Sequence, residues 1–215
     1  PRHLAQARTR RVGKDLSSAA GDRVRRGRIS SSADDRVEFE VGEVVRGPST
    51  LNLTLVLSIF KFDRMEWAIE KCVELGATRI IPVVAQRTEA HLARAAQKRV
   101  ERWQRIARQA AEQSRRASVP EVSQPVSLQE ALTSCDGTRI VLAESEEQTM
   151  LKDALQAKDE AGEIVLAFGP EGGWTESELK LFAGVGWIAA SLGSTILRAE
   201  TAAIAATAIA AAELQ

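Results

Sequence analysis

The sequence has few of the residues that build metal centres and disulfide frameworks. Its 215 residues include two cysteines, two histidines, five phenylalanines, four tryptophans and no tyrosine. Cys72 and Cys135 do not form a C-x-x-C pair, and His3 and His91 lie far apart in the sequence. We therefore expect no disulfide framework and no bound metal. With so few aromatic residues, the core must consist mainly of Leu, Ile, Val and Ala.

Long apolar runs are also missing. No stretch of about 18 apolar residues occurs, so the sequence predicts no membrane-spanning helix. The first residues are rich in arginine and lack the apolar stretch of a secretory signal, so we expect a soluble cytoplasmic protein. Neither the P-loop pattern nor G-x-G-x-x-G is present, which disfavours an enzyme that binds a nucleotide through its phosphates.

Charge is balanced in total but unevenly distributed. The chain has 29 basic and 29 acidic residues, yet residues 1–30 contain nine Lys or Arg against only Asp15 and Asp22. Such a basic segment suits a phosphate backbone, although a solvated terminus could have the same composition.

The hydrophobic pattern changes near Gly47-Pro48. Before this point, alternation over 22–30 and 36–45 predicts strands of a small β-rich domain, which we assign to residues 1–48. After it, we expect strands at 51–58, 78–85, 138–145, 163–168 and 186–193, and helices at 64–76, 97–114, 175–184 and 199–214. Alternating strands and helices predict an α/β domain with a mainly parallel sheet over residues 49–215.

A glycine-rich turn, Gly169–Gly173, follows one predicted strand and precedes a helix that Thr175 and Glu178 would begin as a capping box. Open α/β sheets bind ligands at the carboxyl ends of their strands, and glycine lets a ligand approach the backbone. A tight strand-to-helix turn without a ligand would contain the same residues, so both interpretations stay open here.

A second motif, LGSTILRAETA over residues 192–202, also runs from a strand end into a helix. Arg198 could bind a phosphate or carboxylate through two hydrogen bonds. Glu200 would lie in the first helical turn, where the helix dipole favours a negative charge. Alternatively, Glu200 caps the helix and pairs with Arg198. Further charged clusters occur at 61–66, 86–89 and 112–116, and each of them could be a solvated surface.

Taken together, four segments resemble the ribosomal RNA small subunit methyltransferase E family of the SPOUT class. They are KFDRMEWAIEKCVELGATRIIPVVAQRTEA, AAEQSRRASVPEV, LAFGPEGGWTESEL and SLGSTILRAETAAIAA. The resemblance implies a PUA-like RNA-binding β-barrel followed by an α/β domain with a C-terminal trefoil knot. It also implies a homodimer. Residues 1–50 resemble the family only weakly and are few for a complete barrel.

The resemblance further implies methyl transfer from S-adenosylmethionine to N3 of a uridine in 16S ribosomal RNA, either free or in the assembled small subunit. The methyl donor would lie between three loops and contact mainly their backbone. The residues assigned to this cofactor pocket are Leu142, Ala143, Glu144, Phe168, Gly169, Pro170, Gly172, Gly173, Ser191, Leu192, Gly193, Ile196 and Leu197.

We assign catalytic roles to Arg198, which would stabilise negative charge on the uracil, and to Glu171 and then Glu200 as candidate bases. A structural hydrogen bond from Glu171 to its own loop is the alternative. The RNA would contact basic residues of the N-terminal domain and of the charged clusters, namely Arg23, Arg25, Lys61, Arg64, Arg87, Arg115 and Arg116.

Two other functions fit the same residues. The chain could be another SPOUT methyltransferase that modifies transfer RNA or a ribose 2′-hydroxyl, or a related RNA-binding protein without catalysis. We also expect the alanine-rich face of the terminal helix (Ala202, Ala205, Ala206 and Ala210) to contribute to a dimer.

Overall fold

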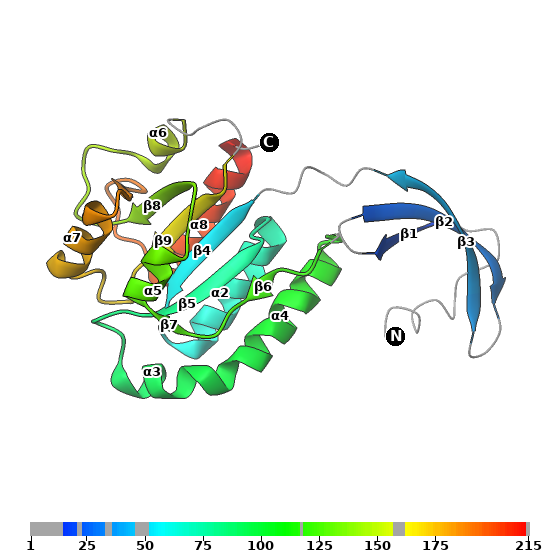
Figure 1. The fold of residues 1–215 in the computed structure, drawn as a ribbon, viewed down its shortest axis with the longest axis horizontal. Coiled ribbons are helices and arrows are strands. Elements are labelled where there is room, and N and C mark those ends of the chain that lie inside the picture. Colours follow the sequence, from blue (N-terminus) through cyan, green and yellow to red (C-terminus); the bar gives the residue numbers. More distant parts are fainter. Residues whose placement is uncertain are drawn as a thin grey trace. The chain divides into compact units, whose positions relative to one another are not determined.

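The computed structural model describes residues 15–20, 23–32, 36–45, 52–116, 118–156 and 162–213 (Figure 1). The chain divides into two compact units. One contains Pro1–Ser49 with Arg115–Ser118, and the other contains Thr50–Ser114 with Val119–Gln215.

The described part of the first unit contains a three-stranded antiparallel sheet in the order β1-β2-β3. Its strands are β1 (Asp15–Ala20), β2 (Arg23–Ser32) and β3 (Val37–Val45). Strands β2 and β3 correspond to the two that the alternating pattern predicts, whereas β1 was not predicted. A closed PUA-like barrel remains a prediction.

The second unit is built on a parallel sheet in the order β10-β8-β9-β4-β5-β6, with β7 also paired to β5. All of its strand pairs are parallel. The strands are β4 (Leu53–Ser58), β5 (Arg79–Val84), β6 (Glu121–Val122), β7 (Val126–Ser127), β8 (Thr138–Leu142), β9 (Ile164–Phe168) and β10 (Ile188–Ala190). This arrangement confirms the α/β fold with a mainly parallel sheet.

Helices pack on both faces of this sheet (Figure 1). One face carries α2 (Phe62–Leu75), α4 (Val100–Gln113), α6 (Leu151–Gln156) and α8 (Ala199–Glu213). The other face carries α5 (Leu128–Thr133) and α7 (Glu176–Gly184). Helix α3 (Ala90–Ala96) and the 3₁₀ turn η2 (Gln97–Arg99) lead from β5 into α4.

The central strand β4 shows why the sheet is covered on both faces. Leu55 and Leu57 are buried in the core beneath α2, whereas Val56 is buried in the core beneath α7. Alternate side chains of a strand point to opposite faces, so a strand buried on both faces consists of a continuous apolar run.

Alanines of α8 let this helix pack closely within the chain. Ala206 and Ala210 are fully buried and belong to the core that also contains α2. Between the two helices, Thr207 Oγ1 donates to Cys72 Sγ over 3.4 Å, and burial raises the pKa of the Cys72 thiol to about 12. The expectation that Ala206 and Ala210 contact a second copy is therefore wrong, because the chain's own core covers them.

The segment before α6 pairs with the segment after β10. Met150 and Ser191 form a parallel bridge, with Ser191 N donating to Thr149 O over 2.9 Å and Leu151 N donating to Ser191 O over 2.9 Å. The trefoil knot remains a prediction. Among the described residues, no helix combines the length and the apolar character needed to cross a membrane.

Candidate functional site

The candidate site lies where the strands of the second unit end. Because neighbouring strands are parallel, the segments that follow β4, β5, β8, β9 and β10 all emerge at the carboxyl edge of the sheet. This is the edge at which open α/β sheets bind their ligands. The glycine turn follows β9, and the 191–198 segment follows β10.

The backbone of the glycine turn favours glycine at two positions. Gly173 N donates to Pro170 O over 2.8 Å, which closes a turn, and Gly173 has a positive φ of 68°. A side chain at Gly169 would place its Cβ 3.3 Å from Gly173 Cα. The local geometry therefore explains glycine at both ends of the turn.

On one side, the turn is attached to the end of β8. The buried indole of Trp174 donates through Nε1 to Leu142 O over 3.2 Å. Its ring also packs edge-on against Phe182 of α7, with the ring centroids 4.9 Å apart. The turn is thereby fixed beside residues 142–144, the second predicted wall of the pocket.

On the other side, Arg87 attaches the turn to the loop after β5. Arg87 Nη1 donates to Gly172 O over 2.5 Å and to Trp174 O over 3.4 Å. The side chain lies so close that a Cβ on Gly172 would be 3.2 Å from Arg87 Cδ. We predicted that Arg87 contacts RNA, whereas these contacts favour a positioning role in the turn.

Helix α7 continues this attachment. Thr175 and Glu178 form the predicted capping box, which the structure confirms. The buried Glu178 carboxylate also accepts from Gln86 N over 2.8 Å. One carboxylate therefore fixes both the start of α7 and the loop that carries Arg87.

Glu171 points toward the loop after β4. Its Oε1 accepts from Lys61 N over 3.3 Å, and the side chain is exposed. The predicted alternative, a bond to its own loop, is thus replaced by a bond to a neighbouring loop. Lys61 is itself exposed, so the Lys61 side chain and the Glu171 carboxylate are both open to a ligand.

The third loop begins at Ser191, which is buried. Its Oγ accepts from Gly193 N over 3.1 Å and donates to Gly193 O over 3.2 Å. Gly193 has a positive φ of 120°, and a Cβ built there would meet no heavy atom within 4 Å. The segment stays beside β8 because Ala143 N donates to Ala190 O over 3.0 Å.

The residues assigned to the pocket thus belong to loops that β8 and its two neighbours bring together. Leu142, Ala143, Phe168, Pro170 and Ser191 are buried and form the base of these loops. The remaining members are half-buried or exposed, namely Glu144, Gly169, Gly172, Gly173, Leu192, Gly193, Ile196 and Leu197. Ile196 is 76% exposed, although it is a large apolar residue.

Arg198 and Glu200 have different surroundings. Arg198 is exposed just before α8, and its carbonyl accepts from Ala202 N over 2.8 Å. Glu200 is buried and pairs with Arg64 of α2, with Nε and Oε1 3.7 Å apart. Its Oε2 has no hydrogen-bond partner among the described residues. The ion pair is therefore with Arg64, which we predicted to contact RNA, and not with Arg198.

Four predicted RNA contacts remain, two on β2 and two in the segment after α4. Arg23 and Arg25 lie on β2, but their side chains fall outside the described part. Arg115 is exposed, and Arg116 is half-buried; burial lowers the pKa of the Arg116 guanidinium. Both residues belong to the first unit.

Sequence reasoning missed two residues that shape the site. One is Trp174, whose position directly after the glycine turn was the available signal. The other is Glu146, which accepts from Gln148 N over 2.8 Å and Thr149 N over 3.0 Å. These bonds, first the one from Thr149, lower the pKa of Glu146. Within the described ranges, no group of three or more His, Cys, Asp or Glu is arranged to hold a metal ion.

Comparison with known proteins shows what the chain is similar to. Residues 47–211 match the family model described as an RNA methyltransferase domain. A ribosomal RNA small subunit methyltransferase E of Rickettsia conorii is 31% identical over 182 residues, which cover 84% of this chain and 72% of that protein. One of Synechocystis is 38% identical over 155 residues, or 71% of this chain and 50% of that protein.

Among solved structures, one similar chain is a ribosomal RNA small subunit methyltransferase E from Neisseria gonorrhoeae bound to S-adenosyl methionine. The two chains are 35% identical with a TM-score of 0.79, over 96% of this chain and 86% of that one. The present chain spans about half the length of the Synechocystis relative.

Proposed function

Because the chain belongs to the ribosomal RNA small subunit methyltransferase E family, we propose that it methylates N3 of a uridine in 16S ribosomal RNA, with S-adenosylmethionine as the methyl donor. The observation that carries this proposal is the junction of three loops at the carboxyl edge of the sheet. Trp174 joins the glycine turn to Leu142, and Ala143 joins β10 to the same segment.

The loops fit such a donor. Gly193 has open space where a side chain would stand, and so does Gly173, so backbone groups can meet a ligand directly. Leu192, Ile196 and Leu197 supply exposed or half-buried apolar groups that would contact an adenine. When bound, the donor supplies an electrophilic methyl group on a sulfonium.

The protein's own task is to prepare the uridine. N3 carries a proton and is a weak nucleophile, so a base must accept this proton while a cation stabilises the charge on the uracil oxygens. Arg198 is exposed beside the third loop and suits the cationic role. Glu171 is exposed on the glycine turn and suits the base better than Glu200, which is buried and paired with Arg64.

Glu200 and Arg64 suit a positioning role instead. Their ion pair links the first turn of α8, directly after Arg198, to the first turn of α2. Removing either partner would leave a poorly paired charge near the core, which is costly. The pair would then act on the reaction through the placement of Arg198.

The N-terminal unit would be a PUA-like domain and would supply further RNA contacts through Arg23 and Arg25. The substrate would be free 16S ribosomal RNA or the assembled small subunit, and the protein would act in the cytoplasm. The target base must leave any stack to reach the loops, because a paired uracil does not expose N3.

We expect a homodimer, although not through the buried alanines. Ile196 is 76% exposed and Trp67 is 49% exposed. They lie near the Arg64–Glu200 pair in the sequence, and a partner copy would cover them. Light scattering at micromolar concentration should give twice the mass of the chain, and the mass of a single chain would reject the dimer.

The experiment that tests the reaction is nucleoside analysis of the product. Purified protein is incubated with methyl-labelled S-adenosylmethionine and either naked 16S ribosomal RNA or small subunits, each from cells that lack the native enzyme. Label in 3-methyluridine supports the proposal. Label in a 2′-O-methylated nucleoside or in transfer RNA would instead indicate another SPOUT methyltransferase. Cofactor binding without transfer would indicate a non-catalytic relative.

A further inference from the structure

Basic residues of the second unit are concentrated on one helical segment. Residues 90–113, which span α3, η2 and α4, contain six Lys or Arg and two Glu. Residues 119–215 contain five Lys or Arg against fifteen Asp or Glu. A polyanion would therefore be attracted to the first segment and repelled by much of the rest.

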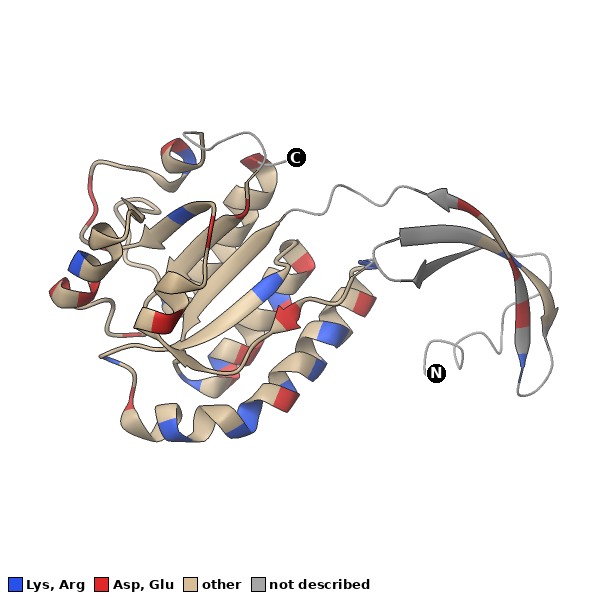
Figure 2. Ribbon diagram, in the orientation of Figure 1, with Lys and Arg blue, Asp and Glu red and all other residues tan. Residues whose placement is uncertain are grey.

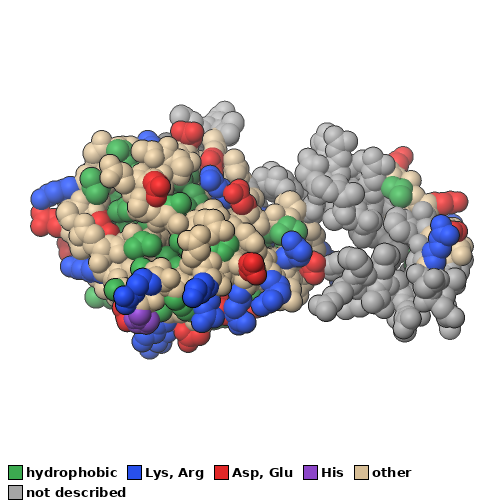
Figure 3. Space-filling view, turned by 60° about the horizontal axis from the view of Figure 1, so that its bottom comes forward, with side chains coloured by type: hydrophobic (Ala, Val, Ile, Leu, Met, Phe, Trp, Pro, Cys, Tyr) green, Lys and Arg blue, Asp and Glu red, His purple; other side chains and the backbone are tan. Residues whose placement is uncertain are grey.

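Four of these basic residues form what we call the basic row: Arg94, Lys98, Arg105 and Arg108. All four are exposed, while α4 buries Trp103 and Ala107 on its opposite face. Figure 2 shows blue segments along α3 and α4, and Figure 3 shows Lys and Arg side chains gathered along the lower part of its view.

The members of the basic row differ from their basic neighbours in ion pairing. Arg102 and Arg99 of the same segment pair with Glu66 of α2 over 2.6 Å and 3.9 Å, and the Arg99 guanidinium lies 4.7 Å from the centre of the Phe62 ring. Within the described part of the chain, no carboxylate pairs with any member of the basic row.

Such a row opposes helix stability. Like charges three or four residues apart repel one another on a helix, as do Arg94 and Lys98 or Arg105 and Arg108. Glu101 and Glu112 lie three or four residues from members of the row and offset part of this repulsion. The face keeps an excess of positive charge, which suits an anionic ligand.

The row begins beside the candidate site. Helix α3 follows the loop that carries Arg87 against the glycine turn, and Arg94 lies in this helix. From Arg94 to Arg108 the helical path is about 20 Å long, at about 1.5 Å per residue. An extended polyanion could therefore follow the helices away from the carboxyl edge of the sheet.

From these observations we propose that the basic row binds the sugar–phosphate backbone of the RNA that flanks the target nucleotide. The inference rests on the proposed function, since it takes RNA as the substrate. Arginine and lysine on an exposed helix attract phosphates without reading bases, so the row supplies affinity and direction and does not select a sequence.

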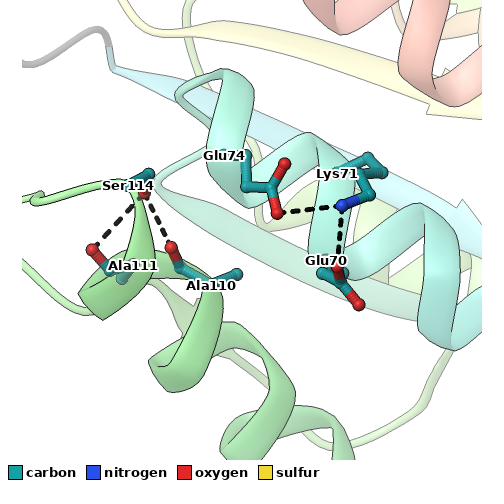
Figure 4. Close-up of polar contacts among 6 residues, drawn as sticks. All are labelled: Glu70, Lys71, Glu74, Ala110, Ala111 and Ser114. Carbon is teal, nitrogen blue, oxygen red and sulfur yellow. Dashed lines mark hydrogen bonds and ion pairs between the residues drawn. The ribbon is translucent and has the colours of Figure 1, made fainter.

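The test compares two triple variants with equal changes of charge. The row variant is Arg94→Gln, Arg105→Gln and Arg108→Gln. The control is Lys71→Gln, Lys152→Gln and Lys180→Gln, which removes three lysines elsewhere on the same unit. Lys71 pairs with Glu70 and Glu74 on α2 (Figure 4), Lys152 with Glu213, and Lys180 with Glu176. Exposed pairs of this kind contribute little to stability.

The measurements are the Kd for a 16S ribosomal RNA transcript as a function of salt, and the KM and kcat of methyl transfer. The row variant should bind the transcript about tenfold more weakly, and its slope of log K against log salt should be shallower by about 2. KM for RNA should rise while the Kd for S-adenosylmethionine stays unchanged. The control should keep the wild-type slope.

Equal slopes and affinities for the row variant and the control would overturn the proposal. It would also be overturned if the row variant lost affinity for assembled subunits while keeping that for naked RNA, because the row would then bind a ribosomal protein. A wild-type protein that binds the transcript but methylates nothing would contradict the proposed function alone, since the binding measurements still test the row.

Discussion

Arg198 is exposed at the start of α8, so its replacement should affect chemistry and not folding. We predict that Arg198→Ala lowers kcat by about 100-fold or more, because a lost donor to a developing negative charge has an effect of this size. The Kd for S-adenosylmethionine and the melting temperature should stay near wild type. A radiometric assay with calorimetry checks this, and wild-type turnover would refute the catalytic role.

Arg87 donates to the carbonyl of Gly172 in the glycine turn and to that of Trp174 directly after it, so we expect it to act on cofactor binding through the turn. Arg87→Ala removes their donor, so we predict about tenfold weaker binding of S-adenosylmethionine, in line with the loss of a charge-assisted hydrogen bond. Arg87→Lys should restore this only in part, because lysine lacks the planar fork.

Lys61→Ala is the matched control for Arg87, because Lys61 contacts the turn through its backbone N–H and not its side chain. It should leave cofactor affinity unchanged. If the Arg87 variant changed KM for RNA but not cofactor affinity, Arg87 would be an RNA contact and not a positioning residue.

Glu146 makes the loop after β8 sensitive to acid. Its pKa lies below the ordinary 4.5 because the carboxylate accepts backbone hydrogen bonds. A lowered folded-state pKa stabilises the protein above the unfolded-state value, and this stabilisation is lost as pH falls through the folded-state value. The difference in stability between wild type and Glu146→Gln should therefore be largest near neutral pH and shrink as pH falls below 4.5 and through the folded-state pKa. Denaturant melts at several pH values check this, with Glu147→Gln as the control.

At the scale of elements, the cap of α7 supports the site as well as the helix. Thr175→Ala should lower the free energy of unfolding by about 1 kcal/mol, as expected for a lost N-cap. It should also weaken cofactor binding. Glu178 of the capping box accepts from Gln86 N and so fixes the loop that carries Arg87.

Ser127→Ala is the matched control for Thr175. Ser127 forms an equivalent capping box on α5, in which its side chain bonds Glu130 and not a residue of the loop that carries Arg87. Both variants should lose similar stability in denaturant melts. If the two variants bound the cofactor equally well, the α7 cap would have no role in cofactor binding.

The longer elements could be predicted because their patterns are periodic. The spacing of Met65, Ile69 and Cys72 predicts α2, and apolar runs predict β4, β5, β8 and β9. The six-residue helices α5 and α6 and the two-residue strands β6 and β7 were missed, since fewer than two helical turns, or a strand of two residues, carry too little periodicity. Ala206 and Ala210 of α8 were assigned to the wrong surface, because an apolar stripe does not say which element covers it.

At the scale of the site, the sequence indicates candidate loops but not the contacts between them. The family resemblance assigns the pocket to residues 142–144, 168–173 and 191–197. The parallel sheet brings these loops to one edge, and the pocket itself stays a prediction. The pairing of Glu200 with Arg64, and of Arg87 with the glycine turn, depends on how distant segments pack. Local sequence contains no signal for such contacts.

At the scale of the whole molecule, the charge pattern suits an enzyme whose substrate is a polyanion. Fifteen acidic residues after residue 118 leave the α3–α4 segment as the basic part of the second unit. Phosphate would meet a favourable surface on those helices, while the loops at the sheet edge present backbone groups and apolar side chains to a smaller ligand.

The measurement that tests this arrangement most directly is amide hydrogen exchange of the intact protein with and without saturating S-adenosylmethionine and no added metal. We predict slower exchange in peptides covering residues 142–144, 168–173 and 191–197, and unchanged exchange on α3 and α4. Protection confined to other segments, or no protection at all in folded protein, would contradict a methyl-donor pocket at this edge of the sheet.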